Sequence, residues 1–317
     1  MRRLDAPPVP LVLILGSLVA FAATAIGTHS NDQLTWAGLG GLVERMVALG
    51  IVALGQTFVI LARSIDLSVA QVISVAAVMA SFVMQGRVEM IGPAVALTLA
   101  ISVAIGLVNG LLVVRARVNP FIATLGVGLC VQGVLSAAFT DFAGSVPRGF
   151  QVLAYGSVGG LPLPILLLLL LTALCWLVLE HTRFGAHLYA VGGNAEGARQ
   201  AGIHTGGVLI AAHVVCGALA GLAGLYLAAR LRSGAPWIGR DGVYDLQSIA
   251  VVVIGGTLLS GGRGGVWGSV AGALLFATLD AMFTMLAVDP FFQQVLRGVV
   301  VIAAVAVYSS RSRLLVA

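Results

Sequence analysis

The sequence predicts an all-α membrane protein, a single transmembrane domain over residues 1–317 with about ten spanning helices. Three observations predict this class. Hydrophobic residues make up 59% of the chain, charged residues make up only 9%, and the mean hydropathy is +1.07. Soluble domains carry about 25% charged residues, so this chain has too few charges to cover a surface that faces water. The charges that it has separate long apolar runs, as is typical of spans in a lipid bilayer.

The first half of the chain contains five apolar runs bounded by charged or polar residues. The first predicted span, about 9–26, exceeds the apolar core of about 7–15 residues found in signal peptides, so we treat it as retained. The next spans lie between Arg45 and Arg63, between Asp66 and Arg87, between Glu89 and Arg115, and from about Pro120 to Thr140.

The second half predicts five more spans. The sixth is centred on the leucine run 166–171, and the others lie at about 207–229, 246–259, 266–279 and 294–308. The eighth and ninth are short and flank a glycine-rich hinge at 260–265. Glycines recur four residues apart within spans, for example Gly264, Gly268 and Gly272, which predicts closely packed helices.

The arginine distribution predicts that both termini lie in the cytoplasm. With that orientation the inner loops and tails hold ten arginines and four acids, whereas the outer loops hold six arginines and eight acids. Loops that stay in the cytoplasm carry an excess of Lys and Arg. Three of the outer arginines fall in the single loop 230–240, which weakens the bias without reversing it.

Composition also excludes several kinds of site. The arginines are scattered singly, so the net charge of +5 forms no nucleic-acid-binding patch. Cys130, Cys175 and Cys216 lie inside apolar runs, and an odd number of cysteines without metal-ligand spacing favours packing roles. The chain has no lysine and therefore no phosphate-binding Walker A loop, so we expect no cofactor in this chain and ATP–Mg chemistry only on a partner.

Polar residues within the spans are candidates for the solute pathway, because such groups are costly in lipid. They are Gln56, Asn109, Gln132 and His213, and Phe121 at the start of the fifth span is a further candidate. Hydrogen bonding between helices is the alternative role. Asp66 and Asp280 are placed at span ends, and no Ser/His/Asp constellation or intramembrane-protease motif is evident, which disfavours proton-coupled transport and catalysis.

The cytoplasmic connection of about 180–206 predicts a short capped helix. Asn194 suits the N-cap, Glu196 lies in the first turn, and Gly202 suits the position after the last turn. About two turns are too short to be stable alone, so we expect the helix to dock into a groove of another protein. Gly197, Ala198 and Arg199 belong to this candidate docking helix; a solvated connection is the alternative.

Four stretches resemble the ribose-type permeases of bacterial ABC sugar importers. They are 55–61 with 65–69; 106–112 with 120–126; the loop 182–203; and 249–257 with 260–264. The resemblance implies a ten-helix permease in the bacterial cytoplasmic membrane, with two copies, identical or different, forming the pathway. It also implies an ATP-binding subunit, which contacts the coupling helix around 194–203, and an external solute-binding protein.

The chain departs from this family pattern near Asp66. Arg63 and Ser64 stand where the family usually has two glycines, Ala70 replaces a glycine, and Gln247 stands where an acid is common. Asp66 itself has two possible roles, a cap of the third span or a gating residue. The alternatives to a sugar importer are a branched-chain amino-acid or nucleoside permease and, from another class, an ion-coupled secondary transporter.

Overall fold

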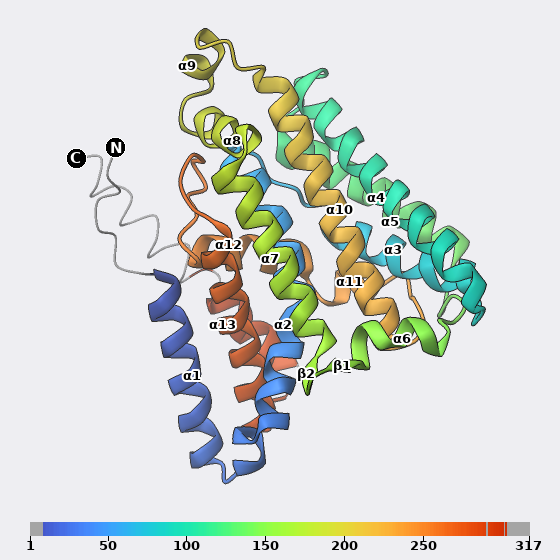
Figure 1. Cartoon of the computed structure of the whole chain (residues 1–317). Helices are drawn as coiled ribbons and strands as arrows, with labels where there is room; N and C mark the ends of the chain where they lie inside the picture. The colour runs from blue at the N-terminus through green and yellow to red at the C-terminus, as the bar shows by residue number, and fades with distance from the viewer. Residues whose placement is uncertain (1–8, 290, 301, 303–317) are drawn as a thin grey trace.

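The computed structural model describes residues 9–289, 291–300 and 302 and is almost entirely helical (Figure 1). Within these residues, seven helices are long and apolar enough to cross a membrane. They are α1 (Val9–Gly27), α2 (Trp36–Leu61), α4 (Ile91–Val114, which follows the 3-10 turn η2, Val88–Met90), α5 (Pro120–Ala138), α7 (Leu163–His181), α10 (Thr205–Leu231) and α13 (Val266–Met285).

Two predicted spans are shorter than a bilayer requires. The third corresponds to α3 (Val69–Met84, 16 residues) and the eighth to α12 (Tyr244–Ile254, 11 residues). At 1.5 Å per residue, neither covers the roughly 30 Å of a hydrocarbon core. Non-helical connections flank both helices, and such backbone is tolerated at membrane depth only when protein surrounds it. The predicted tenth span, 294–308, lies partly outside the described residues, and 291–300 are helical.

The ninth span is longer than predicted, because Asp280 does not end it. Asp280 lies within α13, and its Oδ1 accepts a hydrogen bond from Arg297 Nε at 2.9 Å. An acid inside an apolar helix is tolerated when a charge partner neutralises it. The placement of Asp280 at a span end was therefore wrong.

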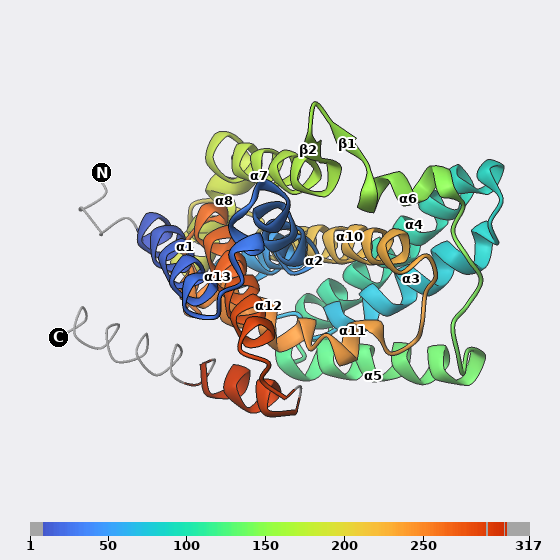
Figure 2. The same cartoon turned by 90° about the horizontal axis from the view of Figure 1, so that it is seen from below.

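Helices α10, α2 and α13 form the interior of the bundle. Within an 18-residue apolar stretch of each helix, 61%, 56% and 61% of the residues are buried, against 17% for α1 and 22% for α5. Figure 2 shows α10 inside the molecule, with α1, α5 and α7 towards its edges. The predicted close packing is confirmed where α4 crosses α10, because a Cβ on Gly106 would lie only 2.4 Å from the His213 carbonyl oxygen.

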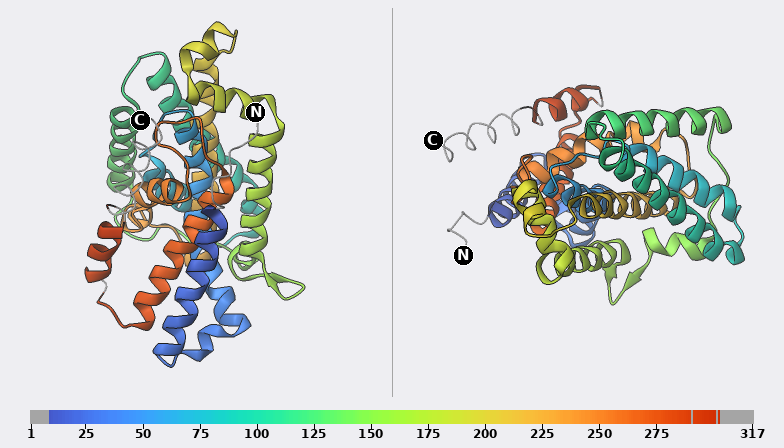
Figure 3. Two further views of the ribbon diagram at one scale, coloured as in Figure 1. Left: turned by 90° about the vertical axis from the view of Figure 1, so that its left-hand side faces the viewer. Right: turned by 90° about the horizontal axis from the view of Figure 1, so that it is seen from above.

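Short elements gather at the two ends of the bundle. At one end lie α8 (Arg183–Gly193) and α9 (Ala195–Gln200); at the other lie η1 (Asn31–Leu34), α6 (Arg148–Tyr155) and the hairpin β1 (Ser157–Val158) with β2 (Leu161–Pro162) (Figures 1 and 3). The remaining helix, α11 (Ile238–Asp241), packs on α3. The two ends therefore carry different candidate surfaces.

Candidate functional site

The connection between α2 and α3, residues 62–68, is irregular backbone enclosed by the bundle. Helix α2 stops because Arg63 adopts a left-handed conformation (φ +61°). The amide of Arg63 donates to Ile60 O at 2.9 Å and that of Ser64 to Val59 O at 3.0 Å, the hydrogen-bond pattern of a Schellman cap. Arg63 thus occupies the position that glycine normally takes in this cap, which explains the glycine that the ribose-type pattern has there.

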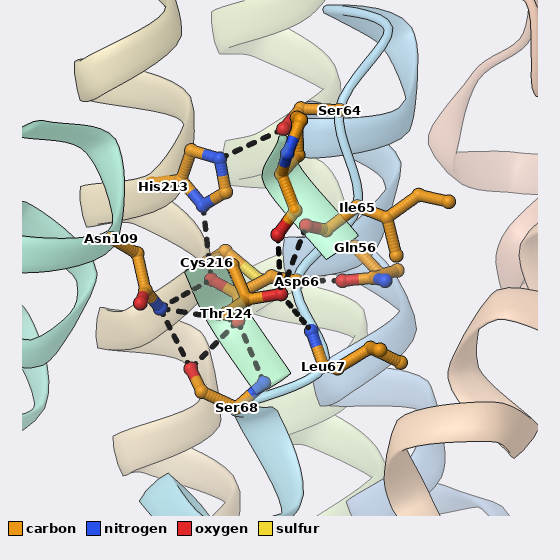
Figure 4. Close-up of polar contacts among 11 residues, drawn as sticks. Gln56, Ser64, Ile65, Asp66, Leu67, Ser68, Asn109, Thr124, His213 and Cys216 are labelled. Carbon is orange, nitrogen blue, oxygen red and sulfur yellow. Dashed lines mark hydrogen bonds and ion pairs between the residues drawn. The ribbon is translucent and has the colours of Figure 1, made fainter. Parts of the chain in front are cut away.

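Asp66 is the centre of a buried polar cluster that joins three elements (Figure 4). Its Oδ2 lies 3.0 Å from His213 Nδ1 on α10, and its Oδ1 accepts from the Ser68 amide at 2.9 Å and the Ser68 hydroxyl at 2.7 Å. Asn109 Nδ2 on α4 donates to both carboxylate oxygens, at 3.3 and 3.2 Å. The carboxylate is therefore bonded to α4, to α10 and to Ser68 of its own connection.

The cluster extends on both sides of the carboxylate. His213 Nε2 lies 3.0 Å from Ser64 Oγ, and Thr124 Oγ1 on α5 accepts from the Leu67 amide at 3.0 Å. The two ring nitrogens of His213 thus join the Asp66 carboxylate to the Ser64 hydroxyl. The connection 62–68 is thus held to α4, α5 and α10 by side-chain hydrogen bonds.

Asp66 lies just before α3, at the end of the third span as predicted, but it is 1% exposed there, and its partner His213 is eight residues, about 12 Å, inside α10. Ser64, His213 and Asp66 also form a hydrogen-bonded Ser–His–Asp row that was not evident in the sequence. A catalytic serine must reach its substrate, however, and Ser64 is 3% exposed with its hydroxyl directed at His213. The geometry favours a structural connection over catalysis.

The candidate pathway residues fall into separate places. Asn109 and His213 join Asp66 in the cluster, and Gln56 lies beside it, with its Oε1 3.6 Å from Cys216 Sγ one turn along α10. Gln56 Nε2 has no partner within the described residues, although the side chain is completely buried.

The two candidates on α5 lie outside this cluster. Gln132 Nε2 bonds Ser136 Oγ at 2.9 Å and the Pro236 carbonyl at 3.4 Å, linking α5 to the segment before α11. Phe121 is 51% exposed at the start of α5. The structure therefore does not bring all five residues to one pathway within this chain.

The short helix predicted in the 180–206 loop is confirmed as α9. Asn194 Oδ1 accepts from the Gly197 amide at 3.0 Å, and Gly202 takes a positive φ of +82° after the helix. Glu196 and Arg199 form an ion pair on the exposed side. Ala198, in contrast, is 6% exposed and packs into the chain's own core. The free face of α9 is formed by Ala195, Glu196, Arg199 and Gln200.

Helix α8, which leads into α9, meets the end of α2 at a junction of glycines. The Gly262 amide donates to the Leu61 carbonyl at 3.0 Å, and a Cβ on Gly192 would lie 1.7 Å from the same oxygen. Tyr189 Oη donates to Gly264 O at 2.9 Å. Leu61 is only three residues before Ser64. The short segment 61–64 therefore contacts the α8 junction at its first residue and the buried cluster at its last. The glycines were visible in the sequence, but no local motif pairs residue 61 with 192 and 262.

Comparison with known proteins places the chain among transport permeases. Residues 39–305 match the family described as the permease component of the branched-chain amino acid transport system. The chain is 35% identical over 289 residues to the ribose import permease protein RbsC of Escherichia coli, covering 89% of this chain and 88% of that protein.

Two further relatives cover similar lengths. Identity is 37% over 271 residues with the ribose import permease protein RbsC of Bacillus subtilis, covering 83% of this chain and 82% of the relative. It is 33% over 279 residues with the galactose/methyl galactoside import permease protein MglC of Escherichia coli, covering 82% of each chain. No solved structure matches the chain.

Proposed function

The chain belongs to the family of branched-chain amino acid transport system permease components, and from this premise we propose that it forms the membrane pathway of an ATP-driven importer for a monosaccharide or related polyol. The observation that carries the choice of solute is its similarity to ribose and galactose permeases over more than four fifths of both chains. The chain is a transport subunit and not an enzyme, so a separate ATP-binding subunit supplies hydrolysis.

We further propose the arrangement of this subunit in a bacterial cytoplasmic membrane. Ten spans, with α3 and α12 completed by their flanking connections and a last helix after residue 290, would put both termini on one side, and the arginine excess of the loops favours the cytoplasm. The α9 end then faces the ATP-binding subunit, and the α6 end faces an extracytoplasmic solute-binding protein. A second permease copy, identical or different, completes the pathway; candidates for lining it are Gln56, Asn109, Phe121, Gln132 and His213.

Two alternatives make different predictions. The family description supports a branched-chain amino acid as solute, whereas the curated relatives named above transport sugars. The buried Asp66–His213 pair supports an ion-coupled transporter, since such pairs serve in proton relays. Against this, both oxygens of the carboxylate already accept hydrogen bonds from side chains of this chain, and α9 has an exposed face that a secondary transporter does not require.

Reconstituted vesicles test these functions. The permease would be combined with its ATP-binding subunit and solute-binding protein, and uptake of radiolabelled ribose, galactose and leucine would be measured. We expect sugar uptake that requires ATP and both partners and that a protonophore does not change. Leucine uptake alone would favour an amino-acid permease. Uptake that persists without the ATP-binding subunit and stops with a protonophore would establish ion coupling instead.

A further inference from the structure

The end of the bundle opposite α9 carries a groove with two arginines at its walls. The groove has a volume of about 450 Å³ and is lined by Arg148, Gln151, Val152, Tyr155, Gly156 and Arg232. It runs between α6 and the residue that follows α10. Helix α6 buries Phe150 and Ala154 against the bundle and leaves Val152 and Tyr155 exposed at 51% and 58%. The side that lines the groove is therefore open to the surroundings.

The groove is built on fixed backbone. Arg232 has a left-handed conformation (φ +62°), and its carbonyl accepts from the Val146 amide at 3.1 Å. Its guanidinium carbon lies 5.5 Å from the centre of the Tyr155 ring, and the Tyr155 hydroxyl bonds the Arg230 carbonyl. Gln151 Nε2 donates to the Val146 carbonyl at 3.1 Å. These contacts position Tyr155 and Arg232 before any partner arrives.

Both arginines lack a carboxylate partner among the described residues. Arg230 lies near Glu44 at 4.0 Å and Arg240 pairs with Asp241 at 3.2 Å, but no such contact is made by Arg148 or Arg232. Helix stability does not explain Arg148 either, because a cation at the start of a helix opposes the helix dipole and α6 has no acid in its first turn. If the α9 end is cytoplasmic, both arginines also oppose the orientation bias of basic residues.

We propose that this groove is a docking site for acidic side chains of the extracytoplasmic solute-binding protein. The inference rests on the proposed function, because it requires an importer supplied by such a protein. A guanidinium binds a carboxylate through two parallel hydrogen bonds. Arg232, held over the Tyr155 ring, and Arg148 on the opposite wall therefore define an acidic counterpart by position as well as by charge. Complementary charges at the edge of an interface mainly raise the association rate and determine which partner binds.

The test uses the permease–ATPase complex in nanodiscs of zwitterionic phosphatidylcholine, with the solute-binding protein that supports uptake in the vesicle experiment. Arg148→Glu and Arg232→Glu together are expected to weaken binding at least tenfold, mainly through slower association. Added salt should weaken wild-type binding more than binding of the variant. ATP hydrolysis without the binding protein should be unchanged, which shows that the variant is folded and assembled.

Arg240→Glu is the control for Arg148→Glu alone, because both change the net charge equally and Arg240 is exposed but lies outside the groove. Equal weakening by Arg240→Glu would overturn the groove assignment in favour of a general effect of charge. An effect that appears only with anionic phosphatidylglycerol would assign the groove to a lipid headgroup and overturn the proposal. If wild-type vesicles show no binding-protein-dependent uptake at all, the proposed function itself fails, and the two failures are thereby distinguished.

Discussion

The Asp66 carboxylate depends on His213 more than on its other partners, because His213 is the one titratable side chain that it contacts among the described residues. The two side chains are 1% and 0% exposed and lie 3.0 Å apart. Removing one member of a buried pair leaves the other without compensation, which costs about 3–5 kcal/mol.

We therefore expect His213→Ala to lower the free energy of unfolding by about 3–5 kcal/mol, measured by denaturant titration in detergent micelles. Ser64→Ala removes only a neutral hydrogen bond and should cost about 1 kcal/mol. In the His213→Ala background, Asp66→Ala should cost less than it does alone. Strict additivity of the two substitutions would contradict the coupling inferred from the geometry.

The left-handed backbone conformation of Arg63 predicts that glycine at this position would stabilise the protein. A side chain in the left-handed region costs about 1–2 kcal/mol, and glycine removes that cost. Arg63→Gly should therefore raise the free energy of unfolding by about 1 kcal/mol. Arg63→Ala keeps the Cβ and should stay within about 0.5 kcal/mol of the original chain. Identical effects of the two substitutions would show that the left-handed conformation is not what limits stability at this position.

At the scale of helices, α9 offers a contact that can be altered without disturbing this chain. Ala195 is exposed and Ala198 is buried, so the bulky substitution belongs at Ala195. Ala195→Trp should leave insertion and thermal stability unchanged but reduce both co-purification of the ATP-binding subunit and transport at least tenfold. Glu196→Gln should change little, because an exposed ion pair contributes about 0–1 kcal/mol. Transport at the original rate in Ala195→Trp would move the coupling contact elsewhere.

The junction between α8 and α2 makes a separate prediction about transmission. Gly192→Ala places a methyl group against the Leu61 carbonyl, whereas the neighbouring Gly193 has open space around a Cβ. We expect Gly192→Ala to lower the unfolding temperature and reduce transport, and Gly193→Ala to do neither. Measuring both variants at equal expression separates a steric effect at the junction from a general effect of helix propensity. Equal loss in both variants would exclude the steric explanation.

For the whole molecule, hydropathy and helix caps predicted where the helices lie along the chain better than they predicted which helices pack together. Apolar runs located the long helices, and Asn194 with Gly202 located α9, because these signals lie within about ten residues of sequence. The length of α3 was missed because hydropathy registers apolar residues and not where a helix begins. The burial of Asp66 was missed because its partner is 147 residues away. Single-sequence patterns carry no information at that separation, and the inward face of α9 was missed for the same reason.

The orientation of the bundle yields the last prediction. At one end of the bundle, the start of α10 lies against the end of α4, because a Cβ on Gly206 would lie 2.7 Å from Val114. At the other end, the start of α2 contacts the turn of the β1–β2 hairpin, where Trp36 Nε1 donates to the Gly160 carbonyl at 3.4 Å. The connection 115–119 and α9 therefore belong to one side, and η1 and the β1–β2 hairpin to the opposite side. The arginine excess predicts that the first side faces the cytoplasm.

Single cysteines can test this assignment in a background with Cys130, Cys175 and Cys216 replaced by alanine. Ser30→Cys and Ser233→Cys should react with an impermeant maleimide added to intact cells, and Ala116→Cys and His204→Cys should react only after the membrane is opened. External labelling at residues 116 and 204 with protection at 30 and 233 would invert the topology. It would also place α6 and its groove in the cytoplasm and α9 outside, where no ATP-binding subunit can reach it. Labelling of residues 30 and 116 from the same side would contradict the arrangement of the helices themselves.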